Sequence, residues 1–335
     1  MIPESPSFSY GEYVKEYITL SMFEGSEGML YAMIDVGSNT IRMAIYEIDG
    51  DRVEMIMKRK HTVGLASYVK EGYMRREGIE KVIEIINGYN EFLGDFGIDH
   101  VTAFTTAALR NAYNGRQAVE EIEYRTGREI HVMTGDEEAT FDFIGATHNL
   151  IDDDGLLIDI GGGSTEIVYF ENRTIKVKVS LPIGSLGFHT RYTGIHILPS
   201  ASECDEMRAE AEATISAVKE YQAVTHAQIC GIGGTFKGAM ALYNSMYGLP
   251  KRNMRMEVKR ISDILWRFQR DHELTQQDKV LLMRTVPERM HTFLPGLIIA
   301  DVLAKRFGSQ NIIFSDSGVR EGYIYDRILD REEFN

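Results

Sequence analysis

The sequence predicts an α/β protein of two lobes that are related by an internal duplication, with an active-site cleft between them. A pattern in which an apolar strand ends on an aspartate and a glycine-rich turn follows occurs twice, at residues 31–40 and 155–165. The two aspartates stand 124 residues apart, which is the size of a domain rather than of a solenoid repeat. Strands also alternate with helical patterns in both halves. Because such sheets bind ligands at strand ends, the repeated turns predict a ligand between the lobes.

The first half of the chain opens with three strand-like segments. A short apolar run at 31–34 ends on Asp35, and residues 41–48 are rich in β-forming side chains. The sequence Asp-Gly-Asp at 49–51 is a strong hairpin signal. Apolar residues then recur at helical spacing. The remaining elements expected in this half are strands at 53–57, 101–105 and 129–133 and helices at 78–93, 114–126 and 137–149.

The second half repeats this opening and is longer. The expected strands are 155–158, 166–170, 174–181, 227–230 and 311–314, and the expected helices are 201–221, 258–271, 276–283, 297–307 and 322–329. We expect an N-terminal extension at 1–29, a first domain at 30–143 onto which 319–335 packs back, and a second domain at 144–318.

Composition restricts the class of protein. The 335 residues are 44% hydrophobic and 26% charged, which is typical of a globular chain, and the net charge is −14. So acidic a chain is a poor partner for DNA or RNA, because phosphate backbones require clustered Lys and Arg. Two isolated cysteines, no membrane-length apolar run and no secretory signal lead us to expect a cytoplasmic protein without a membrane partner.

The glycine turns predict phosphate binding. Glycine lets a backbone approach a phosphate closely and point successive N–H groups at it. A third glycine-rich segment at 231–235 is expected to form a similar loop. A single turn of this kind is usually an ordinary hairpin, but three of them favour an anion site. The candidate phosphate-binding residues from these segments are Gly37, Ser38, Asn39, Thr40, Gly161, Gly162, Gly163, Ser164, Thr165, Gly233, Gly234 and Thr235.

Carboxylates mark the same turns. Asp35 and Asp159 each end an apolar strand, where an unpartnered charge is costly. A divalent cation or an attacking water is a natural partner for them, and Glu166 lies close enough to reach the same site. The alternative is that the aspartates cap their own turns. Glu138 stands in an acidic first helical turn, where helix capping is the better interpretation of the pattern alone.

Four arginines follow strands or precede loops, where a guanidinium can hold phosphate through two hydrogen bonds. Arg110 closes a threonine-rich strand that contains Thr106, and it is the strongest candidate. Arg42, Arg289 and Arg320 stand near other turns and could equally be surface residues. The nine histidines show no metal-ligand spacing, and neither a Gly-x-x-x-x-Gly-Lys loop nor a Gly-x-Ser-x-Gly elbow occurs.

Together these motifs resemble the exopolyphosphatase/guanosine pentaphosphate phosphatase (Ppx/GppA) family, whose members have actin-like (ribonuclease H-like) lobes. The resemblance runs from about residue 31 to 326. The run Ile-Asp-Ile-Gly-Gly-Gly-Ser-Thr-Glu at 158–166 is highly specific. The other segments that carry the resemblance are 34–40, 105–111, 135–139, 181–187, 231–235 and 315–322.

The resemblance implies roles for individual residues. Glu138 matches the catalytic glutamate that acts as the base on water. Asp159 and Glu166 match acids that help in catalysis and hold the cation, Mg²⁺ or another divalent ion. The loops at 38–40 and 161–165 match those that grip the terminal phosphates. The residues expected to join them in phosphate binding are Asp35, Arg42, Thr106, Arg110 and Arg289.

The implied activity is hydrolysis of the terminal phosphoanhydride of inorganic polyphosphate. The same loops would serve the 5′-phosphate of guanosine pentaphosphate (pppGpp), which is the alternative. Two further alternatives are an actin-like ATP-binding kinase, for which 231–235 could supply part of an adenosine pocket, and a silent sensor of guanosine tetraphosphate. We also expect a homodimer. The chain has no C-terminal helical module of the larger members, so we expect a preference for shorter polyphosphate.

Overall fold

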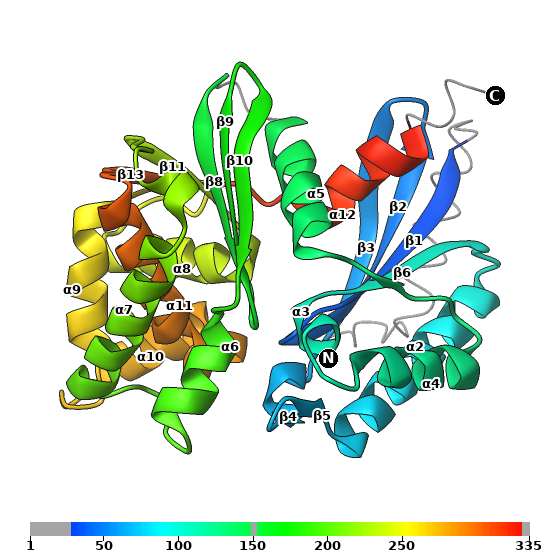
Figure 1. Ribbon diagram of the computed structural model, residues 1–335, viewed down its shortest axis with the longest axis horizontal. Coiled ribbons are helices and arrows are strands. Elements are labelled where there is room, and N and C mark those ends of the chain that lie inside the picture. Colours follow the sequence, from blue (N-terminus) through cyan, green and yellow to red (C-terminus); the bar gives the residue numbers. More distant parts are fainter. Residues whose placement is uncertain (1–27, 149–152, 330–335) are drawn as a thin grey trace, which may run out of the picture.

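A computed structural model describes residues 28–148 and 153–329. Figure 1 shows two lobes, each built on a β-sheet with helices packed against it. Most of the expected extension lies outside the described residues, as does residue 149 of the expected helix. Met29, the last residue of the expected N-terminal extension, already belongs to the first strand. No helix among the described residues is both long and apolar enough to cross a bilayer.

The sheet of the first lobe has the strand order β3-β2-β1-β6-β7. Strands β1, β2 and β3 are antiparallel neighbours, and β6 lies parallel to β1. Strand β3 is longer than expected. It is an edge strand with mostly exposed polar side chains, so no alternation of apolar and polar residues marks its second half in the sequence. The strands are β1 (Met29–Val36), β2 (Thr40–Asp49), β3 (Arg52–Thr62), β6 (His100–Thr105) and β7 (His131–Val132), and β4 (Val69–Lys70) and β5 (Tyr73–Met74) form a separate pair.

The sheet of the second lobe repeats this topology, in the order β10-β9-β8-β11-β13-β12. Strands β8, β9 and β10 are antiparallel neighbours, and β11 lies parallel to β8 as β6 does to β1. The shared order confirms the expected α/β architecture of two related lobes. The strands are β8 (Gly155–Ile160), β9 (Thr165–Glu171), β10 (Thr174–Leu181), β11 (Gln228–Ile232), β12 (Arg255–Glu257) and β13 (Asn311–Phe314).

Helices cover both faces of the first sheet. On one face, α2 (Arg76–Asp95) and α4 (Gly115–Thr126) bury an apolar stripe against β1 and β2. The other face packs against α5 (Gly135–His148) and α12 (Val319–Tyr323), as both views show. The short helix α3 (Ala107–Arg110) follows β6 directly.

The helices of the second lobe enclose the larger core. Two departures from the expected helices lie close to a cavity between the lobes. Helix α8 (Gly233–Met246) begins where a loop was expected. Helix α11 (Met290–Arg306) starts earlier than expected, because burial of its first turns outweighs the breaker Pro295. The other helices are α6 (Ser185–Phe188), α7 (Ala201–Ser216), α9 (Ile261–Phe268) and α10 (Gln276–Thr285), and short 3-10 or π turns cover Leu65–Tyr68, His189–Thr193, Lys219–Tyr221, Val258–Arg260, Pro287–Arg289 and Ile324–Leu329.

Helix α5 lies between the two sheets. Its Phe141 packs into the core of the first lobe, whereas Phe143 packs against Phe170 of the second lobe. Glycines let α12 touch α5 backbone to backbone: a Cβ on Gly322 would stand 1.8 Å from the Phe141 carbonyl oxygen. The expected boundary between 143 and 144 falls inside this helix and stays a prediction.

Candidate active site

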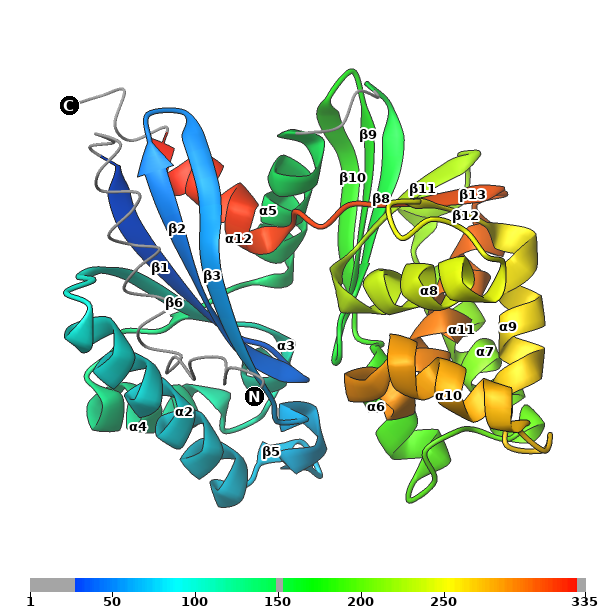
Figure 2. The same ribbon diagram turned by 180° about the vertical axis from the view of Figure 1, so that it is seen from behind.

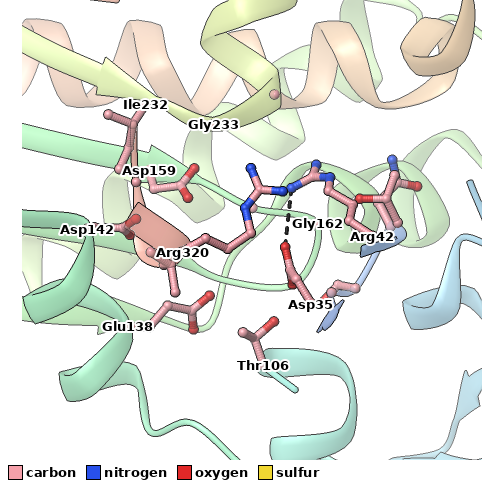
Figure 3. Close-up of a pocket in the computed structure, with 18 of the residues that line it drawn as sticks. Asp35, Arg42, Thr106, Glu138, Asp142, Asp159, Gly162, Ile232, Gly233 and Arg320 are labelled. Carbon is pink, nitrogen blue, oxygen red and sulfur yellow. Dashed lines mark hydrogen bonds and ion pairs between the residues drawn. The ribbon is translucent and has the colours of Figure 1, made fainter. Parts of the chain in front are cut away.

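A cavity of about 140 Å³ lies where the two lobes meet. Its wall includes the glycine turn of each lobe, the inner face of α5, the start of α8 and the segment that leads into α12 (Figure 3). Of the residues that the sequence singled out, the structure brings these into the wall: Asp35, Gly37, Ser38, Asn39, Thr40, Arg42, Thr106, Glu138, Asp159, Gly161, Gly162, Ser164, Gly233, Gly234 and Arg289.

The two glycine turns face each other across the cavity. Each is closed by one backbone hydrogen bond, from Gly37 N to Thr40 O at 3.0 Å and from Gly161 N to Ser164 O at 2.9 Å. A Cβ on Gly162 would stand 3.0 Å from Cβ of Ser38, so glycine is required there for the lobes to approach. The buried side-chain amide of Asn39 has no hydrogen-bond partner among the described residues. It is therefore available to a ligand.

The register of the hairpins pairs each aspartate with the residue seven positions later. Asp35 lies opposite Arg42, and the Arg42 Nη1 to Asp35 Oδ2 distance is 3.4 Å. In the second lobe Asp159 lies opposite Glu166, so two carboxylates occupy the positions that an ion pair fills in the first. Glu166 accepts a hydrogen bond from Ser180 Oγ at 2.7 Å.

Burial and mutual repulsion raise the pKa values of this pair. The pKa of Asp159 rises to about 7, through burial and then through the charge of Glu138. The pKa of Glu166 also rises to about 7, through burial and then through Asp159. Nearby arginines offset these charges only in part, and neither carboxylate forms an ion pair among the described residues, so the pair favours a bound cation.

A capping box positions Glu138 in the first turn of α5. Thr134 and Glu137 exchange hydrogen bonds, with Glu137 N 3.1 Å from Thr134 Oγ1 and Thr134 N 2.8 Å from Glu137 Oε2. The cap is thus supplied by Glu137, which leaves Glu138 to turn inward, where it is 8% exposed. Its carboxylate accepts a hydrogen bond from Arg110 Nη1 at 2.7 Å. Burial and Glu166 raise the pKa of Glu138 well above its usual value, and Arg110 opposes this.

The third glycine segment is not a loop, which corrects the expectation. Residues Gly231 and Ile232 end β11, and α8 begins at Gly233. Gly233 adopts a φ of +77°, and a Cβ there would stand 2.2 Å from Asp159 Oδ1. A Cβ on Gly234 would meet the Arg289 guanidinium at 1.9 Å. Glycine is therefore needed at both positions, so that the Asp159 carboxylate and the Arg289 guanidinium can approach the start of α8, where N–H groups face the cavity.

Five of the expected residues do not line the cavity. Thr165 donates its hydroxyl to Ile183 O at 2.8 Å, and Thr235 donates to Ile160 O at 2.9 Å. These threonines brace the turns rather than face a ligand. Glu166 and Arg110 stand directly behind the wall, where they contact its residues. Gly163 packs against Ser38 of the facing turn.

Ten wall residues were not among the expected site residues, and two of them have buried polar atoms without a hydrogen-bond partner among the described residues. Asp142 stands one helical turn after Glu138, a spacing that places both on one face of α5. Arg320, for which the sequence left phosphate binding and a surface position equally open, reaches the cavity from α12. Its Nη1 is buried and has no hydrogen-bond partner among the described residues. The neighbouring Glu321, held by Tyr46 Oη at 2.6 Å, anchors this segment to β2.

The donor set of the cavity fits a hard divalent cation. Mg²⁺ prefers oxygen ligands and is commonly held by one or two carboxylates together with water and phosphate. Asp159 in the wall and Glu166 directly behind it would supply such a pair. Among the described residues no set of three His, Cys, Asp or Glu side chains is ready to hold a metal ion. A cation here would complete its coordination with the substrate.

Comparison with known proteins places these features in a family context. The model of the Ppx/GppA phosphatase family matches residues 44–331. The bifunctional 3-dehydroquinate synthase/phosphatase of Fusobacterium nucleatum is 25% identical over 315 residues, covering 89% of this chain and 46% of that protein. The guanosine-5′-triphosphate,3′-diphosphate pyrophosphatase of Aeromonas hydrophila is 27% identical over 299 residues, covering 88% of this chain and 59% of that protein. The chain therefore spans about half the length of these relatives.

Solved structures share the fold. The Ppx/GppA family member of Aquifex aeolicus superposes with a TM-score of 0.71 at 25% identity, over 91% of this chain and 99% of that one. An exopolyphosphatase from Cytophaga hutchinsonii superposes with a TM-score of 0.77 at 21% identity, over 90% of this chain and 98% of that one. The likeness confirms the expected pair of actin-like lobes.

Proposed function

Because the chain belongs to the Ppx/GppA phosphatase family, we propose that its cleft hydrolyses the terminal phosphoanhydride of inorganic polyphosphate and releases orthophosphate. The observation that carries this proposal is a cationic groove that leads out of the cavity. The groove encloses about 480 Å³ and shares part of its wall with the cavity. Seven cationic side chains face three carboxylates in its wall. The cations are Arg42, Lys58, Arg59, Lys60, Lys237, Arg289 and Arg320.

The cations of the groove crowd one another. Burial and the nearby Lys237 lower the pKa of Lys58, which means that its charge lacks sufficient counter-charge. Burial and Arg42 likewise lower the pKa of Arg289 to about 10. A chain of phosphates laid along the groove would relieve this repulsion. On a protein with a net charge of −14, such a surface is a local exception and marks a polyanion site.

In the proposed mechanism, individual groups have separate roles. Glu138 is the base that accepts the proton of the attacking water, and Arg110 holds its carboxylate in place. The N–H groups of the two glycine turns and of the start of α8 bind the oxygens of the terminal phosphate. The guanidinium groups of Arg42, Arg289 and Arg320 neutralise the phosphates behind it. A divalent cation, proposed to be Mg²⁺ on Asp159 and Glu166, supplies further charge neutralisation when bound.

The alternative substrate is pppGpp, and one observation favours it. Several curated relatives are named guanosine-5′-triphosphate,3′-diphosphate pyrophosphatases. A guanine base would need a flat apolar surface to stack on. The groove offers one aromatic wall residue, Phe314, which is 7% exposed. Polyphosphate is therefore the substrate that the groove supports better.

The test is orthophosphate release by the purified chain, with and without Mg²⁺. Polyphosphate of defined length, pppGpp and ATP are offered separately and in competition. We expect kcat/KM to be highest for polyphosphate and ATP to be a poor substrate. A higher kcat/KM for pppGpp would establish the alternative. Rates on short and long chains test the expected preference for short polyphosphate, and sedimentation tests the homodimer. The cytoplasmic location stays a prediction.

A further inference from the structure

Asp142 is a buried carboxylate that forms no ion pair among the described residues. It is 1% exposed, and neither Oδ1 nor Oδ2 accepts a hydrogen bond of ordinary length from the described residues. Burying an ionised carboxylate without compensation is unfavourable. The mechanism proposed above gives this residue no task. Its surroundings therefore point to a group that the protein binds.

The carboxylate of Asp142 faces the cavity from the wall that bears Asp159 and Glu138 (Figure 3). Helix α5 places Asp142 one turn beyond Glu138, and Ile232 at the end of β11 lines the same part of the wall. Oδ1 stands 3.2 Å from the position that a Cβ on Gly318 would take. The missing side chain of Gly318 leaves space beside Oδ1, and the backbone N–H of Val319 lies near the same carboxylate.

With all of its carboxylates ionised, the cavity wall carries more negative than positive charge. Six carboxylates line the wall, from Asp35, Glu138, Asp142, Asp159, Asp316 and Glu321. Three guanidinium groups face them, from Arg42, Arg289 and Arg320. A bound phosphate chain adds further negative charge. One divalent cation on Asp159 and Glu166 would leave this excess only partly neutralised. Asp142 is the wall carboxylate whose two oxygens are both buried and lack a hydrogen-bond partner of ordinary length among the described residues.

We propose that Asp142 and Asp159 hold a second divalent cation, which binds together with the phosphate chain. The inference rests on the proposed function only in requiring that phosphate enters the cavity. Oxygen ligands select a hard cation such as Mg²⁺ or Mn²⁺. Two carboxylates are too few for a closed site, so water and phosphate oxygens complete the coordination. Two cations around one phosphate are a recognised arrangement for phosphoryl transfer.

The experiment counts bound Mn²⁺ by electron paramagnetic resonance of the free ion, with and without imidodiphosphate, which is not hydrolysed. We expect wild-type protein to bind about two Mn²⁺ per chain with imidodiphosphate and about one without it. The variant Asp142→Asn should bind about one in both conditions. The control Asp136→Asn removes an exposed acid from the same helix, where it pairs with Lys178 at 2.8 Å, and should bind as wild type does.

A wild-type stoichiometry that Asp142→Asn leaves unchanged would overturn the second site. Crystals soaked in Mn²⁺ and imidodiphosphate give an independent reading, because an anomalous peak beside Asp142 is expected in wild type and not in the variant. Asparagine keeps the shape of aspartate and removes an uncompensated charge, so the variant should fold. Neither measurement requires turnover, so both are independent of whether polyphosphate or pppGpp is hydrolysed.

Discussion

Asp159 and Glu166 face each other across β8 and β9 in the register that Asp35 and Arg42 occupy across β1 and β2. At the residue opposite the aspartate, the two hairpins thus carry charges of opposite sign. The first lobe closes its pair with a guanidinium at 3.4 Å, whereas the second leaves two acids together, each with a pKa raised to about 7. We propose that a divalent cation takes the place of the missing arginine, which would make the second lobe the metal side of the cleft.

The first prediction follows from this pair. Glu166→Gln removes one cation ligand and keeps the hydrogen bond from Ser180, so the lobe should fold normally. The Mg²⁺ concentration for half-maximal orthophosphate release should rise by about tenfold or more. The control Glu171→Gln removes an acid from the other end of β9. An unchanged Mg²⁺ requirement in Glu166→Gln would remove that residue from the metal site.

The second prediction concerns the cationic groove. The double variant Lys58→Gln/Lys237→Gln should raise the KM for long polyphosphate by about tenfold and leave kcat within about twofold, because these lysines contact phosphates far from the reacting end. The matched control Lys219→Gln/Lys251→Gln removes the same charge from outside the groove. A similar rise in KM for both double variants would mean that net charge alone guides the substrate.

The third prediction concerns the contact between α5 and α12. Gly322→Ala forces a methyl group toward the Phe141 carbonyl and should lower the free energy of unfolding by about 1–3 kcal/mol. Gly88→Ala, in the exposed middle of α2 with nothing within 4 Å, should raise it by up to about 1 kcal/mol. Urea unfolding measures both. Equal effects of the two substitutions would show that α5 and α12 do not pack backbone to backbone at Gly322.

The fourth prediction concerns pH. Burial, and then the adjacent His291, lower the pKa of His189 to about 4, and Nδ1 of His189 is buried without a hydrogen-bond partner among the described residues. The neutral ring therefore stabilises the fold fully above the unfolded pKa of about 6.5, and this contribution is lost as the pH falls toward 4.

Between pH 7 and pH 5 the wild type should lose about 1 kcal/mol more stability than His189→Gln does, allowing for the part of the ring that water reaches. The exposed His196 serves as the control, since His196→Gln should lose as much as wild type. Urea unfolding at the two pH values measures the difference. Identical losses in all three proteins would contradict the assignment.

Much of the site could be predicted because its signals are local. The strand, aspartate and glycine turn that contain Asp35 and Asp159 are contiguous in sequence, and repetition at a domain-sized spacing implied two facing lobes. The paired register of Asp159 and Glu166 follows from a tight hairpin, whose length fixes which residues lie opposite.

The rest depends on contacts that sequence spacing does not encode. Asp142 is buried because α12, far along the chain, covers α5. The local sequence around Asp142 therefore indicates only an ordinary acidic residue of a helix. Gly233 and Gly234 read as a loop because glycine is a helix breaker, yet Asp159 and Arg289 require glycine at that helix start. Thr165 and Thr235 carry the hydroxyls expected of a phosphate site, but neighbouring carbonyls bind them.

In the proposed mechanism Glu138 is the base that accepts the proton of the attacking water, and the turnover of polyphosphate by Glu138→Ala measures this role. We expect kcat to fall by at least about a hundredfold, the scale of a general base, with the KM and the thermal unfolding temperature close to wild type. A kcat near that of wild type in the folded variant would mean that Glu138 is not the base.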